Sequence, residues 1–239
     1  MSAVRYLCHA EPELVEFETE VVGVQPGAVL LDRSAFYPGG GGQLPDRGRL
    51  VWDGGTATVT SLFEEGGRFW HRIAGGEPAR GGVRAEIDRE FRATMRQLHT
   101  DLHILNALVY REFNGALVTG AQIGDDRTAR IDFDLPDADN ERLRGLEREV
   151  NDVIRSGLVV RDYYASEAEV RGDPSLLRSR SVAPPPLPDG TVRIVEIADL
   201  DRQACGGTHL TSTAESAPIR VLKVDNKGRH NRRVRIGLV

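Results

Sequence analysis

The spacing of hydrophobic residues changes character near residue 90. Before that point, short apolar runs are separated by Gly and Pro, and residues 18–24 and 28–31 flank the turn sequence Gln25-Pro26-Gly27. This arrangement predicts a β-hairpin. Further strands are expected at 48–52, 57–62, 68–71 and 83–87. Short strands at this spacing predict a small β-barrel or half-barrel over residues 1–90.

Beyond residue 90 the pattern predicts two helices, over 88–113 and 139–156, which end at Asn114-Gly115 and Gly157. Their apolar positions are Met95, Leu98, Leu102, Leu105 and Val109, then Leu143, Leu146, Val150, Val153 and Ile154. Strands are expected at 116–123, 129–133, 159–164, 192–197, 219–224 and 233–239. Residues 172–191, which include Pro184-Pro185-Pro186, are expected to form a loop or spacer. We therefore predict an α+β fold, with the barrel followed by a two-layer α/β domain over 91–239.

Composition narrows the class of protein. The chain has 239 residues, of which 40% are hydrophobic and 28% charged, with a net charge of -5. No run approaches the ~20 apolar residues of a membrane span, and the first residues lack the apolar block of a signal peptide, so no membrane partner and a cytoplasmic location are expected. The net charge argues against a general nucleic-acid coat but permits a local basic surface. Cys8 and Cys205 are the only cysteines, which excludes a disulfide framework, and Cys8 is interpreted as structural.

Two short motifs almost a hundred residues apart provide candidate metal ligands. His99 and His103 are four residues apart, so on a helix they share a face, roughly 6 Å apart along the axis. Cys205 and His209 flank a Gly-Gly turn. Three imidazoles and one thiolate are ligands typical of zinc, whereas magnesium prefers oxygen ligands.

The role of that zinc is open at this stage. Four protein ligands are typical of a structural zinc, whereas a catalytic zinc keeps a position for water. The location of the ligands at a helix edge and a glycine turn, where a cleft can open, favours catalysis. The metalloprotease motif, with Glu directly after the first His, is absent, since Thr100 stands there. Asp101 points ~200° around the helix from His99 and is expected to be a solvated carboxylate rather than a general base.

A glycine-rich segment lies inside the predicted barrel. It runs from Ser34 through four consecutive glycines, including Gly40, Gly41 and Gly42, to Gln43 and Asp46. Consecutive glycines allow close approach of another chain or a ligand. A flexible loop is the alternative, but such a loop does not require the Phe36-Tyr37 pair before it or the polar residues after it.

These motifs resemble the editing domain of alanyl-tRNA synthetase and the free-standing AlaX family of alanyl-tRNA editing proteins. The resemblance rests on His99-x3-His103, Thr119-Gly-Ala-Gln122-Ile, Arg130-Ile-Asp-Phe133 and Cys205-Gly-Gly-Thr-His209-Leu, and covers about residues 14–237. The glycine-rich segment is similar to that of the longer members, which carry an N-terminal β-barrel. Those members commonly have Thr where Ser34 stands.

The resemblance implies a zinc-dependent hydrolase that deacylates Ser-tRNA(Ala), and Gly-tRNA(Ala) as a further substrate. The remaining length leaves no room for an aminoacylation module, so this activity would act in trans. His99, His103, Cys205 and His209 match the zinc ligands, and Thr119 matches the hydroxyl residue that recognises serine. A pocket that hydrogen-bonds a hydroxyl strongly rejects an analogue that lacks it, so Thr119 with Gln122 would accept serine and spare alanine. Activation of water would come from zinc or from the ribose hydroxyl of the substrate.

A basic stretch near the C-terminus is a candidate tRNA contact. Residues 223–235 contain one acid, Asp225, and the basic residues Lys223, Lys227, Arg229, Arg232, Arg233 and Arg235. Such a loop on an acidic protein suits phosphate contacts near the acceptor end, although a solvated turn has the same composition. Two alternatives to the editing enzyme stay open: a zinc-stabilised RNA-binding module without catalysis, and a hydrolase for another aminoacyl ester.

Overall fold

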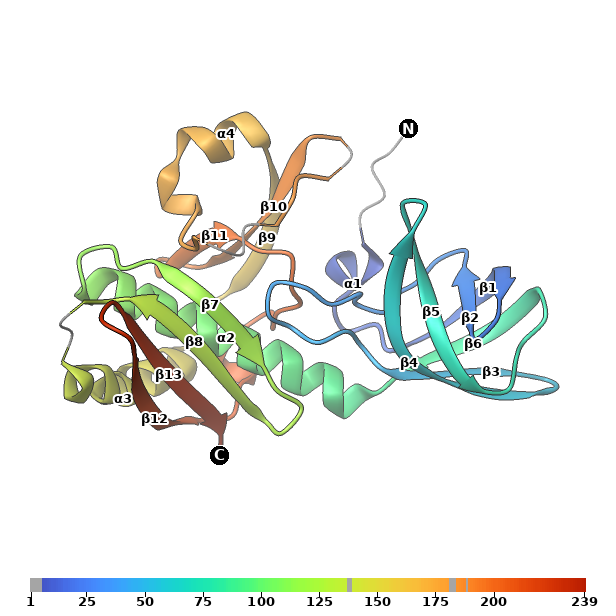
Figure 1. Cartoon of the computed structure of the whole chain (residues 1–239), viewed down its shortest axis with the longest axis horizontal. Helices are drawn as coiled ribbons and strands as arrows, with labels where there is room; N and C mark the ends of the chain where they lie inside the picture. The colour runs from blue at the N-terminus through green and yellow to red at the C-terminus, as the bar shows by residue number, and fades with distance from the viewer. Residues whose placement is uncertain (1–5, 137–138, 181–183, 188) are drawn as a thin grey trace. The chain divides into compact units, whose positions relative to one another are not determined.

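The computed structural model of the chain describes all residues except 1–5, 137–138, 181–183 and 188 (Figure 1). The described residues divide into two compact units. The barrel unit comprises residues 6–40 and 44–94, and the helix-sheet unit comprises residues 41–43 and 95–239. Part of the glycine-rich segment, Gly41–Gln43, thus belongs by its contacts to the helix-sheet unit. In the described part of the chain, no helix is both long and apolar enough to cross a membrane.

The barrel unit is a closed antiparallel barrel with the strand order β1-β2-β5-β4-β3-β6. β1 pairs with both β2 and β6, which closes the sheet on itself. The strands are β1 (Glu16–Gln25), β2 (Ala28–Leu31), β3 (Gly48–Trp52), β4 (Gly55–Glu65), β5 (Arg68–Gly75) and β6 (Gly81–Ile87), preceded by the one-turn helix α1 (Leu7–Ala10). Closure pairs every strand on both sides, so no edge is left to associate with another chain.

The barrel core follows from alternation along the strands. In β1, Phe17, Thr19 and Val21 are buried, whereas Glu16, Glu18 and Glu20 are exposed. The buried core comprises Val15, Phe17, Val21, Val29, Leu31, Ala35, Phe36, Leu50, Val59, Val83, Ala85 and Ile87. The predicted hairpin is confirmed, and Gly27 at its turn has φ +70°, a left-handed conformation that glycine adopts without strain.

A buried ion pair between Asp46 and Arg92 holds the ends of the glycine-rich segment. Arg92 donates through Nε to both carboxylate oxygens, at 3.1 and 3.0 Å, and through Nη2 to the Ala35 carbonyl at 2.6 Å. Asp46 also accepts from the Tyr37 amide at 2.6 Å, and its own amide donates to the Tyr37 carbonyl at 2.9 Å. Removing one partner of a fully buried pair costs roughly 3–5 kcal/mol, because the other charge stays uncompensated. The segment is therefore a closed loop anchored at both ends.

The helix-sheet unit contains a four-stranded antiparallel sheet in the order β12-β13-β8-β7 and a three-stranded sheet in the order β11-β10-β9. The helices are α2 (Arg89–Glu112), which enters this unit at Met95, and α3 (Asn140–Ser156). The strands are β7 (Val118–Ile123), β8 (Thr128–Asp134), β9 (Val160–Ser166), β10 (Thr191–Ile197), β11 (Asp201–Ala204), β12 (Ile219–Lys227) and β13 (Asn231–Leu238). The predicted α+β class is confirmed.

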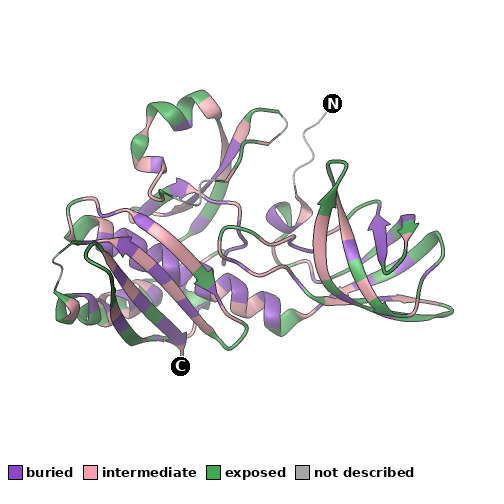
Figure 2. Ribbon diagram, viewed as in Figure 1, coloured by how far each residue is buried: buried purple, intermediate pink, exposed green. Residues whose placement is uncertain are grey.

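Both predicted long helices are confirmed. In α3, Leu143, Leu146, Val150 and Ile154 are buried, and Gly157 caps the C-terminus with φ +66°. In α2, every residue from 98 to 109 is buried, so this helix has no solvated face over that stretch (Figure 2). A helix surrounded in this way is a core element, and its polar side chains must find partners inside the protein.

Five short elements of the described residues were not predicted from the sequence. They are α1, the short helix α4 (Glu167–Gly172), the 3-10 turns Pro174–Leu176 and Thr213–Glu215, and β11. Pro174–Leu176 lies in the loop expected over 172–191. α4 starts with a capping box at Ser166 and Glu169, and β11 alternates the buried polar residues Asp201 and Gln203 with exposed Arg202. The inward residues of β11 are polar, so the strand has no alternation of hydrophobic and polar residues from which it could be predicted. Within the expected loop, residues 181–183 and 188 lie outside the described residues.

His71 makes the stability of the protein depend on pH. It is buried on β5 with Nε2 2.8 Å from the Ser34 hydroxyl, and burial lowers the pKa of His71 from 6.5 to about 4. The unfolded chain therefore binds a proton at a higher pH than the folded chain does. The contribution of His71 to stability is full above pH 6.5 and falls by about 3 kcal/mol as the pH falls to 4.

Urea unfolding at several pH values measures this loss. We expect His71→Gln, which cannot titrate, to flatten the dependence between pH 6.5 and 4. His230→Gln, a change at an exposed histidine, is the matched control and should keep the wild-type slope. Equal slopes for wild type and His71→Gln would show that His71 does not couple protonation to folding.

Candidate metal centre

Four side chains converge in the helix-sheet unit. His99 and His103 come from α2, and Cys205 and His209 come from the turn after β11. One potential ligand atom from each lies within 4.8 Å of all the others, and all four residues are buried. The Cys205 Sγ is 3.4 Å from His99 Nε2 and 3.3 Å from His209 Nε2. The structure thus brings together the two motifs that the sequence placed almost a hundred residues apart.

The other nitrogen of each ring is engaged by a polar side chain. Because Nδ1 is occupied, each imidazole is left with Nε2 to offer to a metal. The pairs are His99 with Gln43 Oε1 at 2.8 Å, His103 with Asp201 Oδ2 at 3.1 Å and His209 with Thr100 Oγ1 at 3.2 Å. Such partners set the tautomer and hold the ring in orientation.

Two of the distances between ligand atoms fit a tetrahedral metal. Zinc–sulfur and zinc–nitrogen bonds of about 2.3 and 2.0–2.1 Å place a sulfur and a nitrogen ligand about 3.5 Å apart at the tetrahedral angle. The sulfur–nitrogen distances of 3.4 and 3.3 Å match this value. The four residues could therefore hold a metal ion, and their donors are those that zinc prefers.

The electrostatics favour the metal-binding form of Cys205 and His209 and the protonated form of His103, which would release its proton on binding a metal. Burial alone would raise the pKa of Cys205, but the nearby charges of His99, His103 and His209 hold it well below its usual value. Burial would lower the pKa of His103, but Cys205 and Asp201 raise it to about 9. Burial and the charge of His99 hold the pKa of His209 well below its usual value. The thiolate is thus favoured, and it is the form that binds metals.

The Cys205–His209 turn is shaped by close packing and by a buried arginine. A Cβ on Gly207 would lie 2.0 Å from His99 Cε1, so no other residue fits there. Arg193 donates through Nη1 to the carbonyls of Cys205 and Gly207 at 3.2 and 2.7 Å. The Gly207 amide in turn donates to the Cys205 sulfur at 3.4 Å. The turn is therefore rigid, despite its two glycines.

Gln43 joins the glycine-rich segment to the centre within the helix-sheet unit. Its Oε1 accepts from the Thr208 amide at 3.0 Å as well as from His99, and its Nε2 donates to Thr208 Oγ1 at 2.9 Å. Gly42 accepts from the Ile123 amide at 2.8 Å, and a Cβ there would lie 2.5 Å from the Ala121 carbonyl oxygen. Close approach, rather than flexibility, explains the glycine at this position.

The outer edge of β7 is covered at both ends. At the end of β7, the Gly42 carbonyl accepts from the Ile123 amide. At the start of β7, the Val118 amide donates to the Arg178 carbonyl and the Val118 carbonyl accepts from the Arg180 amide, each at 2.9 Å. Gly42 is followed by Gln43, the partner of His99, and Arg178 forms an ion pair with Asp201, the partner of His103. The segments that cover the edge therefore also support the metal centre.

Asp101 differs from the prediction. It is fully buried rather than solvated, and it accepts from the Ser216 hydroxyl at 3.0 Å. Burial raises the pKa of Asp101 to about 8, so the neutral carboxyl is favoured at neutral pH. A neutral carboxyl does not act as a general base, so Asp101 stays a poor candidate for that role because of its burial.

Thr119 and Gln122 lie on β7 and bond to other residues of its sheet. The Thr119 hydroxyl donates to Asn231 Oδ1 at 3.3 Å. Gln122 Oε1 accepts from Arg130 Nε and Nη2 at 3.1 and 3.0 Å. Their roles in recognition stay predictions.

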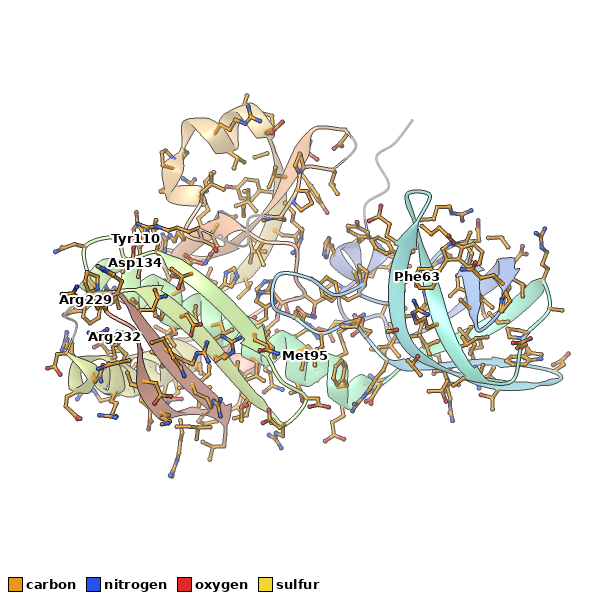
Figure 3. The ribbon with its side chains drawn as sticks, in the orientation of Figure 1. Phe63, Met95, Tyr110, Asp134, Arg229 and Arg232 are labelled. Carbon is orange, nitrogen blue, oxygen red and sulfur yellow. The ribbon has the colours of Figure 1, made fainter. Side chains whose placement is uncertain are left out.

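The basic residues predicted to contact tRNA lie on β12, β13 and the turn between them. Arg232 is buried, and Arg233 donates to both oxygens of Asp132 at 2.7 Å. Lys227 and Arg229 are exposed at the turn, where Arg229 is labelled in Figure 3. Lys223 is exposed and forms an ion pair with Asp225 at 2.8 Å. The exposed cations among them therefore lie both at the turn and on β12.

Several residues that orient the ligands were not predicted from the sequence. Thr100 and Asp201 hold two of the rings, and Arg193 holds the turn. Asp201 precedes Cys205 by four residues, so an acid close to a predicted metal ligand was the signal available in the sequence. Thr100 lies between two predicted ligands, but its contact with His209 depends on the tertiary fold.

Two family models match the chain. Residues 192–235, which contain Cys205 and His209, match the model described as "Threonyl and Alanyl tRNA synthetase second additional domain". Residues 8–91 match the model described as "tRNA synthetases class II (A)". The models thus cover most of the barrel and the half of the centre formed by Cys205 and His209, and both describe domains of tRNA synthetases.

Individual proteins resemble most of the chain. The alanyl-tRNA editing protein AlaX-M of Saccharolobus solfataricus is 39% identical over 223 residues, 92% of each chain. AlaX-M of Methanosarcina mazei is 35% identical over 237 residues, 95% of this chain and 93% of that protein. The chain belongs to the AlaX-M family of alanyl-tRNA editing proteins. It is also 35% identical over 222 residues to the alanine–tRNA ligase of Korarchaeum cryptofilum, of which the match covers 24%.

Removal of the thiolate tests the centre directly. We expect Cys205→Ala to lose bound zinc, because it removes the anionic ligand from a buried cluster. Cys8→Ala, which changes the other cysteine, should retain the wild-type metal content measured by atomic emission after dialysis. A full metal complement in Cys205→Ala would exclude Cys205 from the site.

Proposed function

We propose that this protein is a trans-acting hydrolase that removes serine from mischarged Ser-tRNA(Ala), with Gly-tRNA(Ala) as a further substrate, at a zinc centre formed by His99, His103, Cys205 and His209. The observation that carries the proposal is the buried cluster of three imidazoles and a thiolate in a member of an alanyl-tRNA editing family. The cluster offers the ligands for a zinc ion that could assist ester hydrolysis, and the family membership supports tRNA(Ala) as the carrier of the ester.

The residues of the centre have separate tasks in this proposal. A bound zinc ion would supply Lewis acidity and lower the pKa of water for hydrolysis of the aminoacyl ester. Gln43, Asp201 and Thr100 hold the three rings so that Nε2 faces the centre. Burial around the ligands excludes bulk water, which strengthens every electrostatic interaction there. Thr119 and Gln122 are proposed to contact the serine side chain.

A specific observation favours the second candidate, a structural zinc in an RNA-binding module. All four ligands are protein side chains and all are buried, as in closed structural sites. That module would bind RNA without hydrolysing the ester. Hydrolysis of the aminoacyl ester and binding of tRNA, measured separately, therefore distinguish the two candidates.

The tRNA contact is proposed at the turn between β12 and β13. Lys227, at the end of β12, and Arg229 are exposed there, and Lys223 and Arg235 are exposed opposite each other on β12 and β13. Exposed cations of this kind bind phosphates without reading sequence. Arg233 is engaged by Asp132, and the buried Arg232 contributes to the fold of the hairpin rather than to a surface. The phosphate contact thus depends on fewer of the basic residues than the sequence suggested.

Deacylation assays test the proposal. The zinc-loaded protein should release serine from Ser-tRNA(Ala) and leave Ala-tRNA(Ala) intact, and a chelator should abolish the release until zinc is restored. Retention of serine by Ser-tRNA(Ala) with zinc-loaded protein, together with tRNA binding in a filter assay, would instead support the structural module. Release of an amino acid from a different mischarged tRNA would reassign the substrate.

Thr119→Val tests serine recognition. The variant keeps the side-chain shape and loses the hydroxyl, so we expect the ratio of Ser-tRNA(Ala) to Ala-tRNA(Ala) hydrolysis to fall about 3- to 10-fold, the value of one hydrogen bond. Thr128→Val on β8 is the matched control, since its hydroxyl bonds to Asp126 at 2.7 Å. An unchanged ratio in Thr119→Val would assign serine recognition to other residues.

A further inference from the structure

A line of charged groups leads from one metal-centre histidine to Arg178. His103 Nδ1 is 3.1 Å from Asp201 Oδ2, and the other oxygen of that carboxylate is 2.7 Å from Arg178 Nη1. The side chains of Asp201 and Arg178 are 0% and 12% exposed. No Arg178 contact reaches the four ligands directly, so any effect on the centre must pass through Asp201.

Asp201 differs from the other two ring partners. His99 and His209 are held by a neutral amide and a neutral hydroxyl, whereas His103 is held by a carboxylate. A carboxylate both orients the ring and makes it a stronger ligand. A buried carboxylate is costly unless it is paired, and Arg178 supplies the pairing charge.

Neutral groups complete the surroundings of Asp201. Gln203 Nε2 donates to Asp201 Oδ2 at 2.7 Å, and Asn106 Nδ2 donates to Gln203 Oε1 at 3.2 Å. Among the described residues, Arg178 is thus the cation that the structure pairs with this carboxylate. Its charge offsets that of Asp201, which leaves the Cys205 thiolate as the uncompensated anion beside a bound divalent ion.

Arg178 is itself held in place. Its guanidinium lies 4.3 Å from the ring centre of Tyr110, and its Nε donates to the Ser175 carbonyl at 3.3 Å. Its own carbonyl accepts from Val118 on β7 at 2.9 Å. Tyr110 is labelled in Figure 3. The first two contacts restrict the guanidinium and the third fixes the backbone of Arg178. A group that orients a carboxylate must be held in this way.

We propose that Arg178 is a positioning residue that acts through Asp201 on His103 and thereby raises the affinity of the centre for a divalent metal. The inference rests on the metal centre of the proposed function. It assigns to the 178–180 segment a task beyond pairing with β7. Arg178 does not contact the substrate in this proposal.

The neighbouring Arg180 provides a matched control. It belongs to the same segment and forms an ion pair with Asp134 at 2.6 Å, with its side chain 61% exposed. Asp134 is also labelled in Figure 3. Arg180→Met therefore removes an arginine and an ion pair from the same segment without removing a partner of Asp201.

The experiment measures the zinc dissociation constant of the full-length protein by competition with a chelating dye, and the absorption spectrum of the cobalt(II)-substituted protein. Outer-shell changes alter metal affinity by about 10- to 100-fold. We expect Asp201→Asn and Arg178→Met to weaken zinc binding by about tenfold or more and to shift the cobalt bands. Arg178→Lys should restore most of the affinity because it keeps the charge. Arg180→Met should match the wild type in both measurements.

A double-mutant cycle separates positioning from general destabilisation. If Arg178 acts through Asp201, the double variant Arg178→Met with Asp201→Asn binds zinc about as weakly as Asp201→Asn alone, because the effects are not additive. Additive losses, or a lower melting temperature in Arg178→Met with unchanged zinc affinity and cobalt spectrum, would overturn the proposal. Metal affinity is measured without tRNA, so a failure of deacylation is distinguishable from a failure of this inference. A wild-type protein that binds no zinc would remove the basis of both.

Discussion

The centre depends on one constraint: three imidazoles must turn Nε2 toward a common point inside the protein. Each ring can rotate, so each needs a partner at Nδ1 that selects one orientation. The partners come from the glycine-rich segment, from the middle of α2 and from β11, which are distant in the chain. The complete set of ligands therefore forms only when the helix-sheet unit has folded. A metal that binds this arrangement adds its binding free energy to that of folding.

Two glycines near the metal centre, Gly207 and Gly42, are needed because no side chain fits at their positions. At Gly207 the backbone lies against the ring of His99, and at Gly42 it lies against the backbone of Ala121. A side chain at either position would have to displace a ring or a strand. The glycine content of both motifs is typical of flexible loops. The structure shows instead that the backbone packs closely against other residues at both glycines. The anchoring of the glycine-rich segment by Asp46 and Arg92 in the barrel unit is consistent with this view.

The sequence predicted the elements that carry a hydrophobic period, including all six barrel strands and both long helices. It missed β11, whose inward residues are polar, and it placed Asp101 in solvent. A helical wheel gives the direction of Asp101 relative to His99 but not what lies there, and α2 is buried all around this turn. Candidate ligands followed from residue type and spacing. Their partners could not, because contacts such as Thr100 with His209 depend on how α2 meets the later turn.

The covered edge of β7 links the integrity of the metal centre to the tendency of the protein to self-associate. An exposed strand edge is a template for pairing with another chain, and proteins usually block it with charge, proline or a covering segment. Here the covers are Gly42 and the 178–180 segment, and both lead to residues that hold metal-centre histidines. Anything that loosens these supports would also uncover the edge. Damage to the centre would then appear as self-association of the protein as well as loss of metal.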